Sequence, residues 1–376
     1  MKIYLDNTAS TPLLNEVIDC MNDTMLNLFA NPSSIHFHGR NSKVAIETAR
    51  KSIAKYLNCT PSEIFFTSGG TEANNMALYG CVYDLGVKHV ITSPIEHHAV
   101  LETLENFVHR GLIEIHFVKI NEKGQIDYDS LENLLKTYPA SLVSLMHANN
   151  EISNLLSINK VSRICRKYDA IFHSDTVQTI CHYKIDLQKT DVDFVSCSAH
   201  KFHGPKGIGF IYINKNRVKI SPLLFGGGQE RGMRGGTENI YGVVGMAKAF
   251  EIAHQNMDLD MRKILSLKSY MIENLNKTFV GIEYLGDSAT DGLYTVLSVL
   301  FPENVFDDML LMRLDIEGVS ASSGSACTSG ALKGSHVMKH LKIPENRQTV
   351  RFSFSKFNTI EEIDFCIEVL KKIKNS

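Results

Sequence analysis

The alternation of short apolar runs with helical patterns restricts most strongly what this chain can fold into. The runs are rich in β-branched and aromatic residues, and they cover 64–68, 89–93, 113–120, 142–147, 170–174, 193–198 and 207–213. Amphipathic helical patterns, such as residues 41–57, separate most of them. Because parallel strands are joined by helical crossovers, this succession predicts an α/β protein with a seven-stranded, mainly parallel sheet covered by helices on both faces. A short segment rich in Gly, Pro and His separates the last two runs, which are compatible with an antiparallel pair.

The pattern changes after about residue 250. Long helical patterns cover 259–279 and 359–374, and strand patterns cover 294–301 and 349–355. These elements predict a second, smaller α+β domain.

Composition and charge exclude several classes of protein. The chain has 376 residues, of which 44% are hydrophobic and 21% charged, which allows two globular domains. A net charge of -2 provides no basic surface for neutralising phosphates, so we expect no direct nucleic-acid ligand. The sequence shows neither a secretory signal nor an apolar stretch that could span a membrane, so we expect a soluble, cytoplasmic protein.

The eight cysteines are scattered along the chain, with no C-x-x-C pair and no H-E-x-x-H motif. The sequence therefore predicts neither a metal site nor a disulfide framework. Cys327 differs from the others because it lies in the segment "GVSASSGSACTSG", residues 318–330, whose small residues offer little apolar area to bury. Packing alone does not explain a thiol at that position.

Polar segments follow several of the predicted strands, where open α/β sheets bind their ligands. Gly70 and Thr71 open a predicted helix whose free N–H groups suit a phosphate. Asp175 ends a strand, and Lys201 is flanked by small and polar residues. The chain has neither G-x-x-x-x-G-K nor G-x-G-x-x-G. An anion cradle, a carboxylate and a lysine amine are the groups that a pyridoxal 5'-phosphate site requires.

The ordered series of motifs resembles the cysteine desulfurases of the nitrogen-fixation and housekeeping iron-sulfur type (group I, NifS/IscS-like) of the class-V aminotransferases. The motifs are "YLDNTAST", "NPSSIHFHGR", "FFTSGGTEANN", "EHHAV", "HANNE", "HSDTVQ", "SAHKFHGPKGIG", "GGGQERGMRGGTENI", "SASSGSACTSG" and "VRFSFSKFNT". The resemblance implies the aspartate-aminotransferase fold (fold type I) and a homodimer. It also implies a large pyridoxal-phosphate domain over 15–250 and a small domain formed by 1–14 and 251–376, with the catalytic cysteine loop at about 318–334.

The resemblance also implies roles for residues around the cofactor ring. Lys201 matches the Schiff-base lysine, and Asp175 matches the partner of the pyridinium nitrogen. Gln178 matches the donor to the ring hydroxyl. His97, rather than the adjacent His98, matches the histidine that stacks on the ring and acts in acid–base catalysis.

Further matches concern the phosphate and the substrate. The family's phosphate ligands correspond to Gly70, Thr71, Ser198, His200 and Thr237, the last donated by the neighbouring subunit. Arg351 matches the arginine that pairs with the substrate carboxylate. Asn150 matches a second contact to substrate or cofactor.

The implied activity converts L-cysteine to L-alanine and leaves a persulfide on Cys327, which acts as the nucleophile. The sulfur would pass to an acceptor protein, either an iron-sulfur scaffold or a tRNA-thiolation enzyme. Two alternatives share the fold, a pyridoxal-phosphate-dependent aminotransferase and a selenocysteine lyase.

Several features depart from the family pattern, among them Ala30, Ser153, Ser355 and the C-terminus. Ser153 stands where glycine is common, which concerns only the conformation of its loop. The chain ends at Ser376, without the further tail of housekeeping members, so we expect weak binding to a scaffold.

Overall fold

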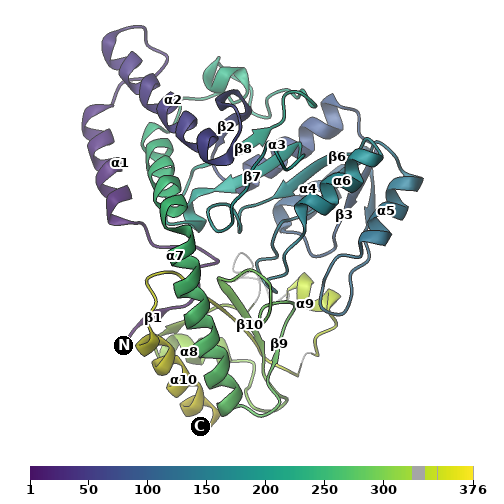
Figure 1. Cartoon of the computed structure of the whole chain (residues 1–376), viewed down its shortest axis with the longest axis vertical. Helices are drawn as coiled ribbons and strands as arrows, with labels where there is room; N and C mark the ends of the chain where they lie inside the picture. Colours follow the sequence, from purple (N-terminus) through teal and green to yellow (C-terminus); the bar gives the residue numbers. More distant parts are fainter. Residues whose placement is uncertain (324–334, 345, 376) are drawn as a thin grey trace.

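The computed structural model describes residues 1–323, 335–344 and 346–375. A large sheet with helices on both faces forms one part, and a smaller part lies below it in Figure 1. The strands of the large sheet, in spatial order, are β2 (Ile64–Thr67), β8 (Gly209–Ile213), β7 (Phe194–Ser198), β6 (Ile171–Asp175), β5 (Leu142–Ser144), β3 (His89–Thr92) and β4 (Glu114–Phe117). Each predicted run overlaps one of these strands.

The direction of the strands confirms the predicted seven-stranded, mainly parallel sheet. Only β8 runs antiparallel to its neighbours, β2 and β7, whereas the other pairs are parallel. The segment between β7 and β8 is too short for a helical crossover, and this explains the antiparallel pairing.

All of these strands except the edge strand β4 are largely buried on both faces, because alternate side chains belong to two different cores. Phe65, Val90 and Leu142 pack in the cluster that contains the apolar faces of α3 and α4. Their neighbours Phe66 and Ile91 pack in a second cluster, with α2, α6 and the first part of α7. The helices of this part are α1 (Asn15–Asn27), α2 (Phe37–Leu57), α3 (Gly70–Tyr79), α4 (His98–His109), α5 (Tyr128–Thr137), α6 (Ile158–Lys167) and the beginning of α7 (Ile240–Thr278).

The smaller part contains a three-stranded antiparallel sheet and a short parallel pair. The sheet has the order β12 (Thr349–Ser353), β10 (Val296–Leu300) and β9 (Glu283–Tyr284), and the pair joins β1 (Ile3–Tyr4) to β11 (Val319–Ser320). Its helices are α8 (Leu310–Ile316), α9 (His336–His340) and α10 (Ile360–Lys374). Both termini lie in this part (Figure 1).

Helix α7 connects the two parts without a break at residue 250. Val243 and Met246 belong to the core of the large sheet, whereas Leu267 and Met271 belong to the core of the smaller part. One long helix therefore serves both cores, and the division into 15–250 and 1–14 plus 251–376 stays a prediction. None of the helices in the described part of the chain has the length and apolar character that a membrane span needs.

Candidate active site

Ten of the predicted site residues line one cavity of about 330 Å³ at the ends of the parallel strands. They are Gly70, Thr71, His97, Asn150, Asp175, Gln178, Ser198, His200, Lys201 and Arg351. Their roles toward a ligand stay predictions. Thr8, Ala9, Asn74, Met146 and Val177 complete the lining and had no role in the sequence-based prediction.

One end of the cavity is suited to an anion. Helix α3 begins at Gly70, and no side chain caps its N-terminus, so backbone N–H groups of its first turn remain available. A Cβ at Gly70 would lie 2.5 Å from Val177 Cγ2, which explains why a glycine is needed there. Thr71 and Ser198 add hydroxyl groups to the same wall. These donors match the oxygens of a phosphate monoester.

His200 lies at the same end and is uncharged at neutral pH. Burial, helped by the charges of Lys201 and Lys206, lowers the pKa of His200 to about 4. Its Nδ1 lies 3.3 Å from Ser10 Oγ. The ring can therefore offer an anion a hydrogen bond but no positive charge.

A fixed carboxylate stands at the end of β6. Val177 N–H donates to Asp175 Oδ1 at 2.9 Å, and Asn74 Nδ2 donates to Asp175 Oδ2 at 2.7 Å. Asn74 Oδ1 lies 3.1 Å from Nε2 of the buried His173, whose pKa burial lowers to about 4. The network orients the Asp175 carboxylate, which suits a protonated ring nitrogen.

Lys201 lies in a 3-10 turn, Ala199–Lys201, that directly follows β7. Its Nζ donates to the carbonyl oxygens of Thr8 at 2.7 Å and Ala9 at 2.9 Å. Gln178 Nε2 donates to the same Thr8 oxygen at 3.3 Å. The N-terminal segment thus forms one side of the cavity and holds the lysine amine at its wall.

The structure separates the two adjacent histidines. His97 is the N-cap of α4 and accepts a hydrogen bond from Ala99 N–H on Nδ1 at 3.0 Å, so the neutral ring carries its proton on Nε2. Burial lowers the pKa of His97, although the charge of Asp175 raises it. His98 does not line the cavity, and its ring lies 4.6 Å from that of His336.

Arg351 supplies a buried positive charge from β12. It is 2% exposed, and its Nη2 pairs with Asp6 Oδ1 at 2.9 Å. Its Nη1 donates to the Asn150 carbonyl oxygen at 3.1 Å. Arg351 Nε has no hydrogen-bond partner among the described residues. The Nε–H therefore remains for a carboxylate.

Among the described residues, one predicted site residue does not line this cavity. Thr237 lines a separate hollow together with Ser68 and Arg234, so its predicted contact with a neighbouring subunit's phosphate stays a prediction. Cys327 lies outside the described residues.

Comparisons with known proteins show which family the chain belongs to. The model of the family Aminotransferase class-V matches residues 3–365. "Cysteine desulfurase IscS" of Dictyoglomus turgidum is 41% identical over 376 residues, which are 99% of this chain and 94% of that protein. A solved "NIFS-LIKE PROTEIN" has a TM-score of 0.90 at 35% identity and covers 100% of both chains. The structure "SspA in complex with cysteine" has a TM-score of 0.81 at 30% identity and covers 96% of this chain and 100% of that chain.

Proposed function

This chain belongs to the class-V aminotransferase family, and we propose that it is the pyridoxal-phosphate-dependent cysteine desulfurase that its residues predict. The observation that carries the proposal is the single cavity that contains Lys201, Asp175, Arg351 and the uncapped start of α3. Full-length similarity to a cysteine desulfurase supports the same activity. The substrate is L-cysteine, and the products are L-alanine and sulfur bound to the enzyme.

The residues present fit the cofactor. The N-terminus of α3, Thr71 and Ser198 would hold the phosphate, and the oriented Asp175 carboxylate would hold the ring nitrogen. When bound, pyridoxal phosphate supplies an electron sink for the bonds broken at the substrate. Lys201 would provide the amine that anchors the cofactor's aldehyde.

Side chains of the cavity would have different roles in the reaction. Arg351 would bind and orient the substrate carboxylate through the Nε edge of its guanidinium. Lys201 Nζ would move the proton at the α carbon, and the Nε2–H of the neutral His97 ring would donate a hydrogen bond within the cavity. Arg351 would thus bind the substrate, Lys201 would transfer the proton and His97 would support the reacting groups, but none of them accepts sulfur.

Sulfur transfer would use Cys327. Its thiolate attacks the sulfur of the substrate, so a sulfur–sulfur bond forms while the carbon–sulfur bond breaks. The electron pair of the broken bond stays with the carbon skeleton, which takes up a proton and leaves as alanine. Cys327 keeps the sulfur as a persulfide.

The experiment compares three variants for bound cofactor colour and for alanine released from L-cysteine. Cys327→Ser should stay yellow and should still change its absorption spectrum on addition of L-cysteine, yet release almost no alanine. Lys201→Ala should lose both the colour of the wild type and turnover. Cys20→Ser, which alters a partly buried thiol of α1, serves as the control and should behave like the wild type.

Turnover by Cys327→Ser at close to the wild-type rate without an added thiol would contradict the proposal. The aminotransferase alternative predicts instead that the wild type itself releases no alanine from L-cysteine, because transamination moves the amino group and leaves the carbon–sulfur bond intact. Replacement of L-cysteine by selenocysteine in the same assay tests the selenocysteine lyase alternative.

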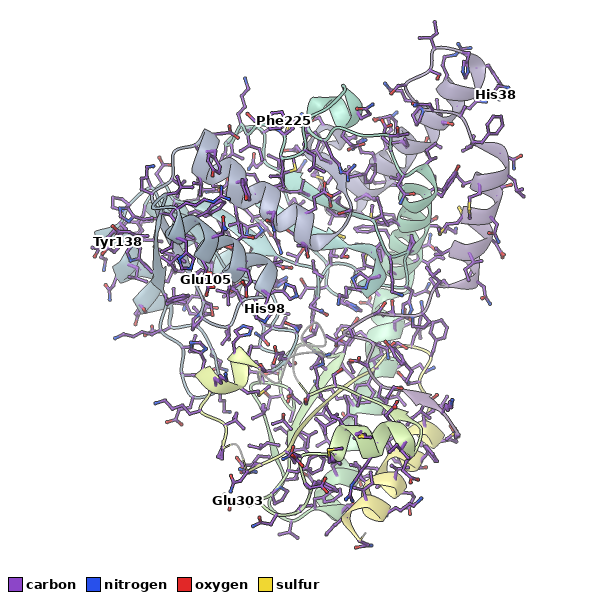
Figure 2. The ribbon with its side chains drawn as sticks, turned by 180° about the vertical axis from the view of Figure 1, so that it is seen from behind. His38, His98, Glu105, Tyr138, Phe225 and Glu303 are labelled. Atoms are coloured by element: carbon purple, nitrogen blue, oxygen red, sulfur yellow. The ribbon has the colours of Figure 1, made fainter. Side chains whose placement is uncertain are left out.

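The proposal includes a homodimer and a sulfur-acceptor protein. Large apolar side chains are exposed on α1, on α2, in the segment between these helices and in the loop after β8, which is unusual for a surface that faces water. They are Leu26, Phe29, Ile35, Phe37, Val44, Leu224 and Phe225, and we call them the apolar end patch. Figure 2 labels Phe225 and His38, which both lie at the end of the molecule opposite the smaller part.

The acceptor would be an iron-sulfur scaffold or a tRNA-thiolation enzyme. A reducing compartment such as the cytoplasm is part of the same proposal, because the seven cysteines in the described ranges are all free thiols.

A further inference from the structure

Three potential metal ligands lie together at the edge of the large sheet. His89 is the first residue of β3, Glu114 is the first residue of the edge strand β4, and the parallel register places them opposite each other. His116 lies two residues after Glu114. Because side chains alternate along a strand, Glu114 and His116 project to the same face, and His89 projects beside them. The backbone itself therefore brings the three side chains together.

The distances between their polar atoms are those of ligands to one ion. His89 Nδ1 lies 3.2 Å from His116 Nε2, and the two nitrogens lie 3.7 Å and 4.0 Å from Glu114 Oε2. Two imidazole nitrogens that bind one tetrahedral zinc ion at about 2.0–2.1 Å are roughly 3.3 Å apart. The observed nitrogen–nitrogen distance would fit such an ion without any shift of the strands.

An aromatic ring holds both imidazoles in place. The Tyr138 ring stacks on His116 with ring centroids 3.8 Å apart and an interplanar angle of 13°, and it lies 4.7 Å from the His89 ring. Rings held in this way lose little freedom when they bind an ion. Figure 2 labels Tyr138 at the outer edge of the large part, away from His98.

The cluster is open to solvent on its carboxylate side. The Glu114 side chain is 71% exposed, whereas those of His89 and His116 are 34% and 14% exposed. An ion can therefore reach the two nitrogens from water, and the Glu114 carboxylate can turn to meet it. None of the three residues lines the catalytic cavity.

We propose that His89 Nδ1, His116 Nε2 and the Glu114 carboxylate bind a divalent transition-metal ion such as Zn²⁺. Two imidazoles and one carboxylate are ligands that suit zinc, nickel and copper. The remaining coordination position is left to water. The sequence offers little sign of this site, because His89 and Glu114 lie far apart along the chain and only the pairing of β3 with β4 joins them.

Calorimetric titration of the purified holoenzyme with Zn²⁺ tests the proposal. The wild type should bind one more ion per chain than either His89→Ala or His116→Ala, and Glu114→Gln should weaken that binding event. His109→Ala removes an exposed histidine of α4 outside the cluster and should bind Zn²⁺ like the wild type. Zinc bound by cysteine thiols contributes equally to all of these titrations. The test is therefore the difference between wild type and variant in the number of zinc ions bound per chain.

Equal titrations for the wild type and His116→Ala would overturn the proposal, because the 3.2 Å contact would then be only a hydrogen bond between the two rings. X-ray absorption of the zinc-loaded wild type gives a second test that needs no variant. Imidazole scattering around the ion supports the site, whereas sulfur ligation alone refutes it. Alanine production by His116→Ala should equal that of the wild type, since His116 lies outside the catalytic cavity.

Discussion

Ser153 has a backbone conformation that serine rarely adopts. Its φ is 72°, in the left-handed region where glycine is favoured, and this agrees with the glycine that is common in the family at this position. The side chain compensates in part, because the buried Ser153 Oγ donates to the Leu293 carbonyl oxygen at 2.9 Å. The residue thus combines backbone strain with a stabilising hydrogen bond.

Substitution of Ser153 separates these two effects. Ser153→Ala keeps the strain and loses the hydrogen bond, so its free energy of unfolding should fall by about 1 kcal/mol. Ser153→Gly also loses the bond but relieves strain of about 1–2 kcal/mol, so we expect a stability close to that of the wild type. Urea denaturation of the two variants tests whether Ser153→Ala has a lower free energy of unfolding than Ser153→Gly. An alanine variant as stable as the glycine variant would show that the backbone is not strained.

At the scale of single residues, the sequence predicted which side chains would lie together in the cavity, but not the residues that orient them. Lys201, Asp175 and Arg351 occur in recognisable motifs. Asn74 and His173 lie in quoted motifs too, yet their role in orienting Asp175 depends on contacts between distant elements. Such contacts leave no local pattern in the sequence.

The start of α3 shows how one element is adapted to bind an anion. Glycine at position 70 lets the helix approach Val177 closely, and this places the first N–H groups at the cavity wall. Any side chain at that position would meet the methyl groups of Val177.

Gly70→Ala should therefore lower the affinity for pyridoxal phosphate, because the added methyl group forces α3 away from Val177. Removal of the obstructing methyl groups in Gly70→Ala/Val177→Ala should restore part of the affinity, and Val177→Ala alone controls for the loss of packing. The affinity is measured by titrating the apoenzyme of each variant with pyridoxal phosphate. The absorption of the bound cofactor reports how much has bound. Equal affinity of Gly70→Ala and the wild type would refute the steric explanation.

At the scale of elements, buried strands were the most predictable feature. Each carries apolar residues for two cores, so it forms a continuous apolar run between polar turns. Helix α7 was less predictable, because its pattern indicated only 259–279, whereas the helix begins at Ile240. The first part of α7 packs against the core of the large sheet and the second part against the core of the smaller part. The apolar pattern of the sequence therefore changes within a single helix. The pairing of β1 with β11 joins segments too short and too distant to be predicted.

Lys268 is a buried cation in the second half of α7. It is 3% exposed, and its Nζ donates to the Leu293 carbonyl oxygen at 3.3 Å. Burial lowers the pKa of Lys268 from 10.5 to about 8. The unfolded chain therefore holds this proton at pH values where the folded protein has released it, and the free energy of unfolding rises with pH between about 8 and 10.5.

Lys268→Met should stabilise the protein at pH 7 by roughly 3 kcal/mol, since it removes a cation that is costly to bury. The advantage should shrink as the pH rises through 8 toward 10, because the wild-type amine is then neutral in the folded state. Urea denaturation of both proteins at pH 7 and 9.5 measures the difference. A stabilisation that does not change with pH would mean that packing, rather than charge, distinguishes the variant.

At the scale of the whole molecule, two features are consistent with the proposed homodimer: the apolar end patch and the position of Thr237 outside the cavity. Ile35 is 90% exposed and Phe225 is 84% exposed. Exposure of apolar surface to water costs free energy, and a second copy of the chain would remove that cost by covering these side chains. Thr237 lies outside the cavity of its own chain, although its motif match assigns it to a phosphate. A dimer would explain both features.

In the dimer that we propose, Ile35→Asp would place a charge within the apolar end patch, so the variant should be a monomer. The variant should also lose bound pyridoxal phosphate, since each cavity would lack the hydroxyl of the partner's Thr237. Val280→Asp is the matched control, as Val280 is 95% exposed but lies on the smaller part, outside the patch. It should remain a dimer with its full content of cofactor.

Sedimentation velocity measures the state of association of each variant, and absorption measures its bound cofactor. If Ile35→Asp dissociates but keeps its cofactor, the patch forms the interface and the role of Thr237 is wrong; if it stays a dimer, the interface lies elsewhere.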